Sequence, residues 1–246
     1  MATTDLPEGL AREIERLRGT GGRVVPIDLG RAGHFWLKQV EVLSLRLRLQ
    51  KGDPARALDA ECSALLMLAR IGMPVADVVV SGAGYLVLRD HGRTLHHLLQ
   101  NRAGPPDLIA AFSAAGRSLS RLHRAGYAHG RPALRDICWD GHQARLIDLE
   151  NFDPRKRRSW RRALDMVMLA QSYFTLRPGD EHLLDVAMQS YRDQAKVADW
   201  TALQRLVSHL GWFAGPSRLL AQLRPKAREA QAVGLTLDYL RRLTAT

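Results

Sequence analysis

Two aspartates near the middle of the chain have a type and spacing suited to chemistry. Asp136 and Asp148 lie twelve residues apart in the stretch HGRPALRDICWDGHQARLIDLENF, which runs from His129 to Phe152. Paired carboxylates suit a hard, oxygen-preferring cation such as Mg²⁺. Arg131, five residues before Asp136, cannot accept a proton, because a guanidinium has a pKa above about 12 and no acceptor lone pair. The two carboxylates are therefore candidate ligands for such a cation, and Arg131 is not a candidate proton acceptor.

A second pair of charged residues lies in the first third of the chain. Lys38 closes the apolar run HFWLKQV, and Glu61 begins a stripe with Leu65 and Leu68 at helical spacing. Because this stripe is apolar, Glu61 is expected on a buried helix face, where a carboxylate needs a cationic partner. Two interpretations stay open here: Glu61 pairs with Lys38, or Lys38 is a solvated strand-end lysine and Glu61 a rim residue.

Two differently built parts of the chain must position these residues. Before residue 100, short β-like runs occur at 33–40, 74–82 and 84–92, with one helical pattern at 57–72. After residue 100 the sequence is largely helical, with buried-face spacing in Leu108, Phe112, Ala115, Leu119 and Leu122. The junction LLQNRAGPPD is rich in Asn, Gly and Pro. We therefore predict an α+β fold with a β-rich part, 1–100, and a helical part, 101–246.

A small hairpin is expected immediately before Asp148. The β-like runs 137–139 and 144–147 are separated by the turn sequence DGH, 140–142. The second run ends in Asp148-Leu149-Glu150, and a loop that starts at His129 precedes the first run. This arrangement predicts that the loop lies beside Asp148 at the mouth of the hairpin.

Composition and charge limit the kind of protein this is. The chain has 246 residues, 46% of them hydrophobic, so it is long enough for one well-cored unit or two small lobes. The net charge of +11 favours phosphate-rich partners: nucleotides, nucleic acid or an anionic membrane surface. Cys62 and Cys138 show neither zinc-site nor disulfide spacing, which fits a reducing cytoplasm. The polar start is not typical of a signal peptide, and no apolar run approaches about 18 residues. A cytoplasmic protein is expected, with any membrane contact peripheral, at the inner face of the cytoplasmic membrane.

The order of these features resembles the protein-kinase-like superfamily. The chain is most similar to the bacterial lipopolysaccharide core kinases, the Kdo and heptose kinase group, and more distantly to aminoglycoside phosphotransferase-like kinases; the match runs from about residue 24 to about 175. The resemblance implies a bilobal fold with a small β-rich N-lobe holding one main helix and a larger helical C-lobe. It also implies ATP and Mg²⁺ as cofactors and a sugar or related hydroxyl as acceptor.

The resemblance assigns roles residue by residue. Lys38 matches the strand lysine that binds the α/β-phosphates, and Glu61 the helix acid that holds that lysine. Leu88, Arg89 and Asp90 match the segment that covers adenine. His129 matches the start of the catalytic loop, 129–136. Further along, Asp148 matches the metal-binding acid of the motif 148–150, and Asp165 the helix acid that braces the loop from below.

Two departures from the family pattern affect what can be inferred. Only Gly30 and Gly33 precede Lys38, so backbone cradling of phosphates is in doubt. Aligned on His129, Arg131 occupies the position of the catalytic base and Asp136 that of the metal-binding asparagine. Arg131 is then expected to stabilise charge or the acceptor, with Asp136 as metal ligand and proton acceptor. An alternative register makes Arg135-Asp136 the Arg-Asp pair of the loop.

Several functions therefore stay open. The preferred one is ATP-dependent phosphoryl transfer to a hydroxyl, with catalytic residues Asp136, Arg131 and His129 and metal ligands Asp148 and Asp136. The main alternative is a pseudokinase with weak or no catalysis that acts as a nucleotide-binding regulatory or scaffold module. The third is a basic nucleic-acid-binding protein, which is disfavoured because positive charge is spread along the chain and no reading module is visible. The basic run 154–162 is expected to hold a phosphorylated sugar or anionic lipid headgroups, or else to be a solvated charge run.

Overall fold

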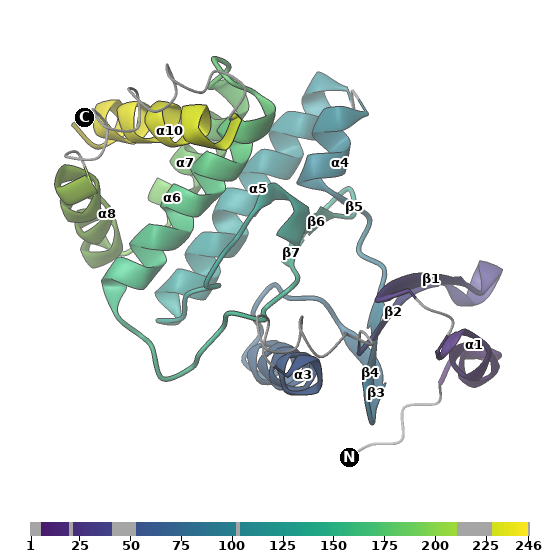
Figure 1. The fold of residues 1–246 in the computed structure, drawn as a ribbon. Coiled ribbons are helices and arrows are strands. Elements are labelled where there is room, and N and C mark those ends of the chain that lie inside the picture. The colour runs from purple at the N-terminus through teal and green to yellow at the C-terminus, as the bar shows by residue number, and fades with distance from the viewer. Residues whose placement is uncertain (1–5, 20–21, 41–52, 102–103, 211–227, 246) are drawn as a thin grey trace. The chain divides into compact units, whose positions relative to one another are not determined.

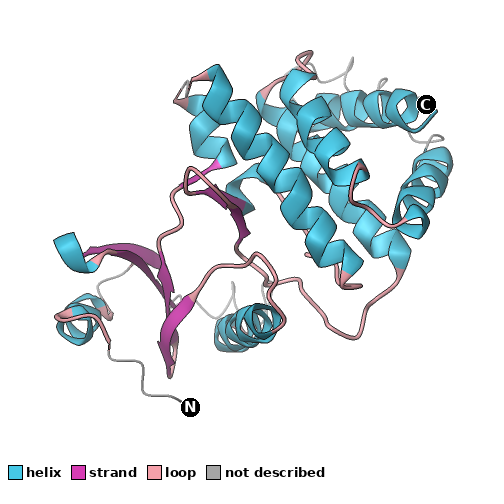
Figure 2. Ribbon diagram, turned by 180° about the vertical axis from the view of Figure 1, so that it is seen from behind, coloured by secondary structure: helices cyan, strands magenta, loops and turns pink. Residues whose placement is uncertain are grey.

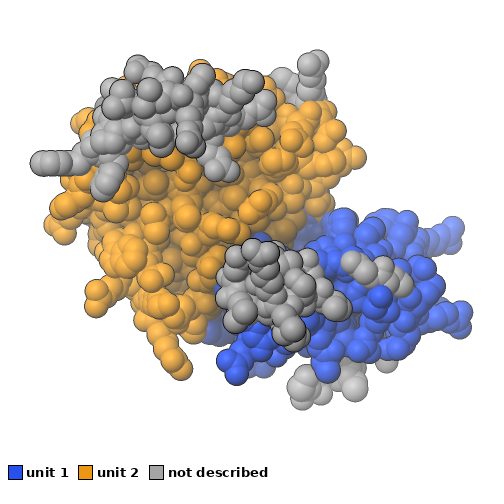
Figure 3. All heavy atoms as spheres, in the orientation of Figure 1, with its two compact units in different colours: residues 1–91, 148–150 blue, residues 92–147, 151–246 orange. Residues whose placement is uncertain are grey.

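The computed structural model describes residues 6–19, 22–40, 53–101, 104–210 and 228–245. It contains two compact units, coloured separately in Figure 3. The first comprises Met1–His91 together with Asp148–Glu150, and the second comprises Gly92–Ile147 and Asn151–Thr246. The elements are shown in Figure 1.

The first unit is built on a four-stranded antiparallel sheet. Its strands are β1 (Val24–Asp28), β2 (His34–Gln39), β3 (Val78–Gly82) and β4 (Tyr85–Arg89), in the order β1-β2-β4-β3. The predicted β-like runs before residue 100 are thus confirmed, and they pair with one another as magenta arrows in Figure 2 show.

One face of this sheet packs on helix α1 (Leu10–Leu17). The apolar side of α1 and alternate residues of β1, β2 and β4 form a buried cluster of Leu10, Ile14, Leu17, Ile27, Phe35, Leu37 and Val87. Because side chains alternate across a strand, the residues between these ones face the opposite side of the sheet. Lys38, next to Leu37, is therefore on the face away from α1.

Helix α3 (Pro54–Arg70) packs near β3 and β4. Its start is fixed by Asp53, whose side chain accepts a hydrogen bond from the Ala55 N–H, and by Pro54 at the first helical position. Its buried residues include Glu61, Leu65 and Leu68, so the predicted apolar stripe with an acid at its start is confirmed.

The second unit contains a small sheet of three short strands, β5 (Arg93–Thr94), β6 (Ile137–Trp139) and β7 (Ala144–Leu146). The predicted hairpin is the antiparallel pair β6–β7. Helix α4 (Leu95–Gln100) follows β5 and buries Leu95, Leu98 and Leu99. Gly92–Gln100 therefore belongs to the second unit, and the predicted division at residue 100 is placed too late, because the pairing of β5 with β6 and the apolar side of α4 tie this stretch to the helical part.

Helices make up most of the second unit. They are α5 (Pro105–Arg124), α6 (Ser159–Leu176), α7 (His182–Arg192), α8 (Val197–Leu210) and α10 (Arg228–Ala245). All five predicted buried-face residues of α5 are buried: Leu108, Phe112, Ala115, Leu119 and Leu122. The predicted α+β class is confirmed. Cys62 and Cys138 are free thiols in this structure.

No helix among the residues that the structure describes is both long and apolar enough to span a bilayer. Two short 3₁₀ turns complete the elements that matter below. These are η1 (Gly30–Ala32), between β1 and β2, and η2 (Leu134–Asp136), directly before β6.

Gly116 permits the close crossing of α5 and α7. A Cβ atom at this position would stand 2.1 Å from the Ala187 carbonyl oxygen, a backbone atom that cannot move aside. We expect Gly116→Ala to lower the free energy of unfolding by about 1–3 kcal/mol, measured by urea unfolding, because overpacking forces backbone shifts. Arg117→Ala, a change at the exposed neighbouring position, should stay within about 0.5 kcal/mol. Equal effects of the two substitutions would contradict this packing.

Candidate functional site

Lys38 is placed by the register of the first sheet. It lies near the end of β2, opposite Val24 of β1 and Leu86 of β4. Its neighbours on the buried side of the strand fix the orientation of β2, since Phe35 and Leu37 are almost fully buried against α1. The lysine is only 9% exposed, so the interpretation of Lys38 as a solvated strand-end residue is wrong.

Lys38 is held between two carboxylates. Its Nζ donates to Glu61 Oε1 of α3 at 2.5 Å and to Asp148 Oδ1 at 3.3 Å. The first of these pairs joins residues 23 positions apart and the second residues 110 positions apart. The expected Lys38–Glu61 pair is thus confirmed, and it brings Asp148 into the same cluster within the first unit.

Glu61 is held at an unfavourable position for a charged carboxylate. It is 2% exposed, and burial raises the pKa of Glu61 above its ordinary value of 4.5, although Lys38 acts in the opposite direction. Desolvation therefore outweighs the attraction of the lysine. A buried ion pair of this kind contributes little to stability, and such perturbed groups are typical of functional sites.

Asp148 has an unusual backbone. Its φ is 59°, and among the described residues it is the one non-glycine residue with positive φ. The left-handed conformation is disfavoured for residues with a Cβ, although aspartate tolerates it better than most. The chain adopts it just after β7, where Asp148–Glu150 joins the first unit. In this conformation the Asp148 carboxylate lies 3.3 Å from the Lys38 ammonium.

Glu150 adds a further contact at the same motif. Its Oε2 lies 3.5 Å from the Arg23 guanidinium, whose side chain is half exposed. Arg23 also lowers the pKa of Glu61, as a smaller influence than burial or Lys38. Reasoning from the sequence did not identify Arg23, and no motif there marks it.

The sheet face that carries Lys38 also carries Leu88, one of the residues expected to cover a base. Trp36 and Leu88 are paired across β2 and β4, two residues along the strands from the Lys38–Leu86 pair, and therefore lie on the same face. Leu88 is 5% exposed and the Trp36 side chain 38%. A partly exposed aromatic ring therefore lies on this face, two residues from Lys38 in β2.

Asp90 directly follows β4. Its backbone N–H donates to the His34 carbonyl oxygen at 3.0 Å, which continues the pairing of β2 with β4 by one residue. The structure thus places Leu88 and Asp90 at the end of the strand that lies beside β2. Their expected contact with adenine stays a prediction.

The loop between β1 and β2 is closed on itself. The N–H groups of Leu29, Ala32 and Gly33 donate to carbonyl oxygens within the loop, and the Gly30 N–H donates to Asp28 Oδ1 at 2.8 Å. Four backbone donors are thus already engaged. The inference from the sequence that this loop is a poor phosphate cradle is supported by these bonds.

In the second unit, Asp165 of α6 holds the loop that starts at His129. Its carboxylate accepts the N–H of His129 at 2.6 Å and that of Gly130 at 3.0 Å, and it also contacts His123 Nε2 at 3.1 Å. His123 Nδ1 in turn lies 2.8 Å from the Tyr191 hydroxyl. The predicted role of Asp165 in holding this loop is confirmed. His123 and Tyr191 extend the hydrogen-bonded network around it.

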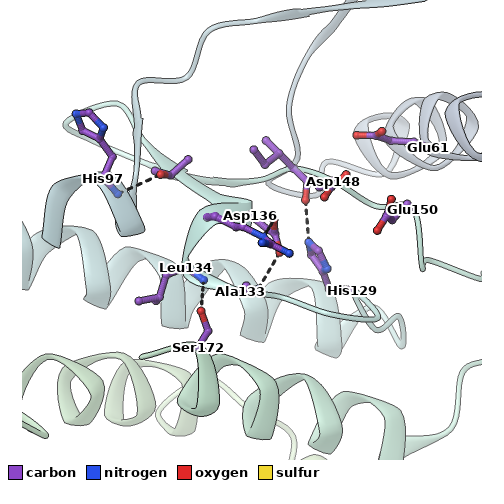
Figure 4. A network of polar contacts seen from close by, with 12 residues as sticks. Glu61, His97, His129, Ala133, Leu134, Asp136, Asp148, Glu150 and Ser172 are labelled. Atoms are coloured by element: carbon purple, nitrogen blue, oxygen red, sulfur yellow. Dashed lines mark hydrogen bonds and ion pairs between the residues drawn. The ribbon is translucent and has the colours of Figure 1, made fainter. Parts of the chain in front are cut away.

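His129 has the contacts of a residue that positions the loop. Its ring Nε2 lies 3.0 Å from the Ile147 carbonyl oxygen, and the residue is 1% exposed (Figure 4). Because a carbonyl oxygen only accepts, this ring nitrogen is the donor. The catalytic role expected for His129 stays a prediction, and the observed geometry is that of positioning.

Asp136 lies at the end of η2 and is 3% exposed. Its Oδ2 accepts the Ala133 N–H at 3.0 Å, and its Oδ1 lies 3.7 Å from Arg135 Nε (Figure 4). The Leu134 N–H donates to Ser172 Oγ of α6 at 3.0 Å, which ties the same turn to the helix below. The carboxylate therefore shapes its own loop, and its role as metal ligand or proton acceptor stays a prediction.

Arg131 is half-buried and follows Gly130, whose φ is 102°. A Cβ atom on Gly130 would lie 2.6 Å from the Asn151 carbonyl oxygen, so glycine is required there. The position of Arg131 in the loop is therefore fixed by two backbone devices, the Asp165 brace and this glycine. Its expected role in charge stabilisation stays a prediction.

The basic run 154–162 divides into structural and exposed residues. Arg162 is buried, with Nε 2.7 Å from Asp199 Oδ1 of α8, and Arg157 donates to the Ala125 carbonyl oxygen and lies over the Tyr127 ring. Lys156 pairs with Asp153 at 3.1 Å. The simple expectation of a solvated run is therefore wrong for Arg162, because its guanidinium neutralises a buried acid.

Across the described ranges, no three His, Cys, Asp or Glu side chains are grouped as a metal site would group them. Comparison with protein families gives no match to any family model. A protein of Haemophilus influenzae, named only as an uncharacterized protein, is 28% identical over 199 residues, which cover 79% of this chain and 79% of that protein. This relative's name states no activity, so the functional argument rests on the geometry above.

The raised pKa of Glu61 predicts how stability depends on pH. The folded chain holds the Glu61 proton up to a higher pH than the unfolded chain does. The contribution of Glu61 to the free energy of unfolding is therefore complete below about pH 4.5 and is lost as the pH rises through the pKa of the folded state. We expect the difference in unfolding free energy between wild type and Glu61→Gln to fall across that range and then level off. Urea unfolding at a series of pH values measures it. A difference that grows with pH would mean that Lys38 outweighs burial.

Proposed function

We propose that the protein is an ATP-dependent phosphotransferase of the kinase-like type, acting on a hydroxyl acceptor. In this proposal the first unit binds the nucleotide, with the Lys38 ammonium on its phosphates and Glu61 holding the lysine in place. The bilobal kinase-like fold is part of the same proposal. The four-stranded antiparallel sheet with α3 beside it, and the helical second unit, support it.

One observation carries this proposal: a lysine ammonium buried between Glu61 and Asp148, on a sheet face that also exposes an aromatic ring. An ammonium has three donors, and two point at these carboxylates. Neither the buried Glu61 nor the left-handed Asp148 is favourable for stability, and residues held in such states are typical of functional sites.

The donor set suits Mg²⁺ bound together with a polyphosphate. Magnesium in proteins is usually held by one or two carboxylates plus phosphate oxygens and water, rather than by a full cage of side chains. Asp148 supplies one such carboxylate, half-buried and fixed in position. When bound, the ion would neutralise phosphate charge. Asp136 as a second ligand remains a prediction.

The nucleotide base would lie on the same sheet face as Lys38. Trp36 and Leu88 present an indole ring and an aliphatic side chain two residues from the lysine, about 7 Å along the strand. Planar bases stack on exposed aromatic rings. Because the β1–β2 loop is closed, recognition by side chains of the sheet face replaces cradling by backbone N–H groups.

The second unit supplies a braced loop for the acceptor. The Asp165 brace fixes the backbone at His129 and Gly130 and so sets where Arg131 begins. Phosphoryl transfer passes through a loose transition state in which positioning and charge neutralisation supply most of the acceleration. Arg131 would stabilise charge on the transferred group, as an arginine finger does. A lipopolysaccharide-core sugar or a related small molecule is the proposed acceptor.

A second candidate is a nucleotide-binding pseudokinase that serves as a regulatory or scaffold module. It is favoured by one observation: the Asp136 carboxylate is engaged with the Ala133 N–H and lies near Arg135, as a purely structural acid would be. A guanidinium at the base position points the same way, because Arg131 cannot accept a proton. Nucleic-acid binding stays disfavoured.

Nucleotide binding is tested first by thermal stabilisation. We expect MgATP at about 100 times its dissociation constant to stabilise the fold by about 2.7 kcal/mol, roughly 5–10 °C in Tm. Asp148→Asn should abolish the shift, and asparagine is chosen because it tolerates positive φ. Asp59→Asn, at an exposed position of α3, is the matched control and should keep the shift.

Testing the role of Lys38 in MgATP binding requires a double substitution. Lys38→Met alone leaves the buried Glu61 without its cation, which costs about 3–5 kcal/mol. Lys38→Met with Glu61→Gln removes both charges, and we expect a folded protein without the MgATP shift. A shift that persists in both this variant and Asp148→Asn would contradict the proposed site.

Turnover separates the enzyme from the pseudokinase. If Asp136 is the proton acceptor, Asp136→Asn should reduce ATP turnover by about 10²–10⁴-fold. Asparagine can still accept from the Ala133 N–H, so the loop should survive. Asp107→Asn, in the exposed first turn of α5, is the control. Unchanged ATP turnover in Asp136→Asn would reject Asp136 as the proton acceptor. If the wild-type protein binds MgATP but does not turn it over, the pseudokinase is favoured.

A further inference from the structure

A groove of about 500 Å³ lies in the second unit, lined by the first turn of α6 and one side of α8. The two helices pack beside each other (Figure 1). Ser159 and Trp160 line it from α6, and Thr201, Arg205, Leu206 and His209 are among the residues that line it from α8. None of these residues belongs to the nucleotide site proposed above.

The two helices that form the groove are fixed to each other. Arg162 of α6 places Nε and Nη2 at 2.7 Å and 2.6 Å from the same oxygen, Oδ1 of Asp199 in α8. Asp199 is 1% exposed, so its negative charge is neutralised inside the protein. The groove is thus preformed, and the acid nearest to it along α8 presents no charge to a ligand.

The groove is electropositive at one end. Arg158 precedes α6 and does not cap it with its side chain, so the first N–H groups of this 18-residue helix carry the positive end of its dipole. Arg205 lines the same groove from α8. Helix N-terminal N–H groups together with a guanidinium bind phosphate oxygens well.

The rest of the lining suits a hydroxylated ring. The Trp160 side chain is 43% exposed, with the Arg161 guanidinium 4.8 Å from its ring centroid, and Leu206 adds apolar surface. Thr201 and Ser159 supply hydroxyls. His209 Nδ1 lies 2.6 Å from the Arg205 carbonyl oxygen and donates to it, which fixes the orientation of the ring.

We propose that this groove binds a small phosphorylated sugar. Its phosphate would lie at the first turn of α6 and against Arg205, and its ring would lie against Trp160, with hydroxyls on Thr201 and His209. An aromatic surface with a few convergent polar groups is the usual lining of a small-molecule site. This proposal stands on the second unit alone and does not depend on nucleotide binding.

Titration calorimetry on the full chain tests the site with glucose 6-phosphate, glucose and inorganic phosphate as probes. We expect glucose 6-phosphate to bind more tightly than either of the other two. Arg205→Gln should weaken its binding at least about tenfold through loss of a charged hydrogen bond. Trp160→Ala should weaken the binding of glucose 6-phosphate but change the affinity for inorganic phosphate by no more than about twofold.

Two controls locate the binding. Arg117→Gln removes an exposed arginine of α5 and should leave all three affinities unchanged. Lys38→Met with Glu61→Gln should also leave them unchanged, even though it removes nucleotide binding. The proposal is overturned if glucose 6-phosphate does not bind at millimolar concentration, if Arg205→Gln binds it as wild type does, or if the Lys38 double variant loses it. A failure of MgATP to bind would leave this result unaffected.

Discussion

The first unit depends on one buried ammonium group. Lys38 lies between Glu61 and Asp148 and holds them in one cluster. The lysine comes from strand β2, Glu61 from helix α3 and Asp148 from a distant segment of the chain. Without the lysine, two carboxylates would face each other in a poorly solvated place. The position of α3 beside the sheet and the return of Asp148–Glu150 to this unit are both consistent with that need. The burial that raises the pKa of Glu61 shows that the cluster is not optimised for stability.

The second unit uses a buried acid in the opposite way. Asp165 is surrounded by donors from the His129 and Gly130 backbone and from His123, so its lone pairs are satisfied by the protein itself. A fully satisfied buried carboxylate makes its surroundings rigid and needs no ligand. Lys38 instead belongs to a cluster in which burial outweighs the pairing of Glu61 with its cation. The contrast separates an acid that positions a loop from a cluster that the proposed nucleotide would complete.

Much of this could be predicted from the sequence where periodicity and charge agree. The stripe of Glu61, Leu65 and Leu68 indicated the helix face. Its pairing with Lys38 was left open by the residues themselves and was assigned by the resemblance to kinase-like proteins. The boundary at residue 100 was placed late because a two-residue strand, Arg93–Thr94, has too little pattern to be seen. The Arg162–Asp199 pair was hidden within a run of basic residues, since composition does not show which arginine is buried. The conformation of Asp148 has no local signal, because it is imposed by tertiary contacts.

In the proposed phosphotransferase, Arg131 would be less damaging to phosphoryl transfer than its inability to accept a proton suggests. A general base contributes about 10²–10⁴ to a rate, whereas positioning and charge neutralisation supply the larger share in a reaction with a loose transition state. In the proposed function, Lys38 and Asp148 would neutralise phosphate charge, while Asp165 holds the loop through the His129 N–H. A buried lysine between two acids serves the fold no better than apolar residues of similar size would. The cluster is therefore the strongest support for the proposal that the first unit binds a nucleotide.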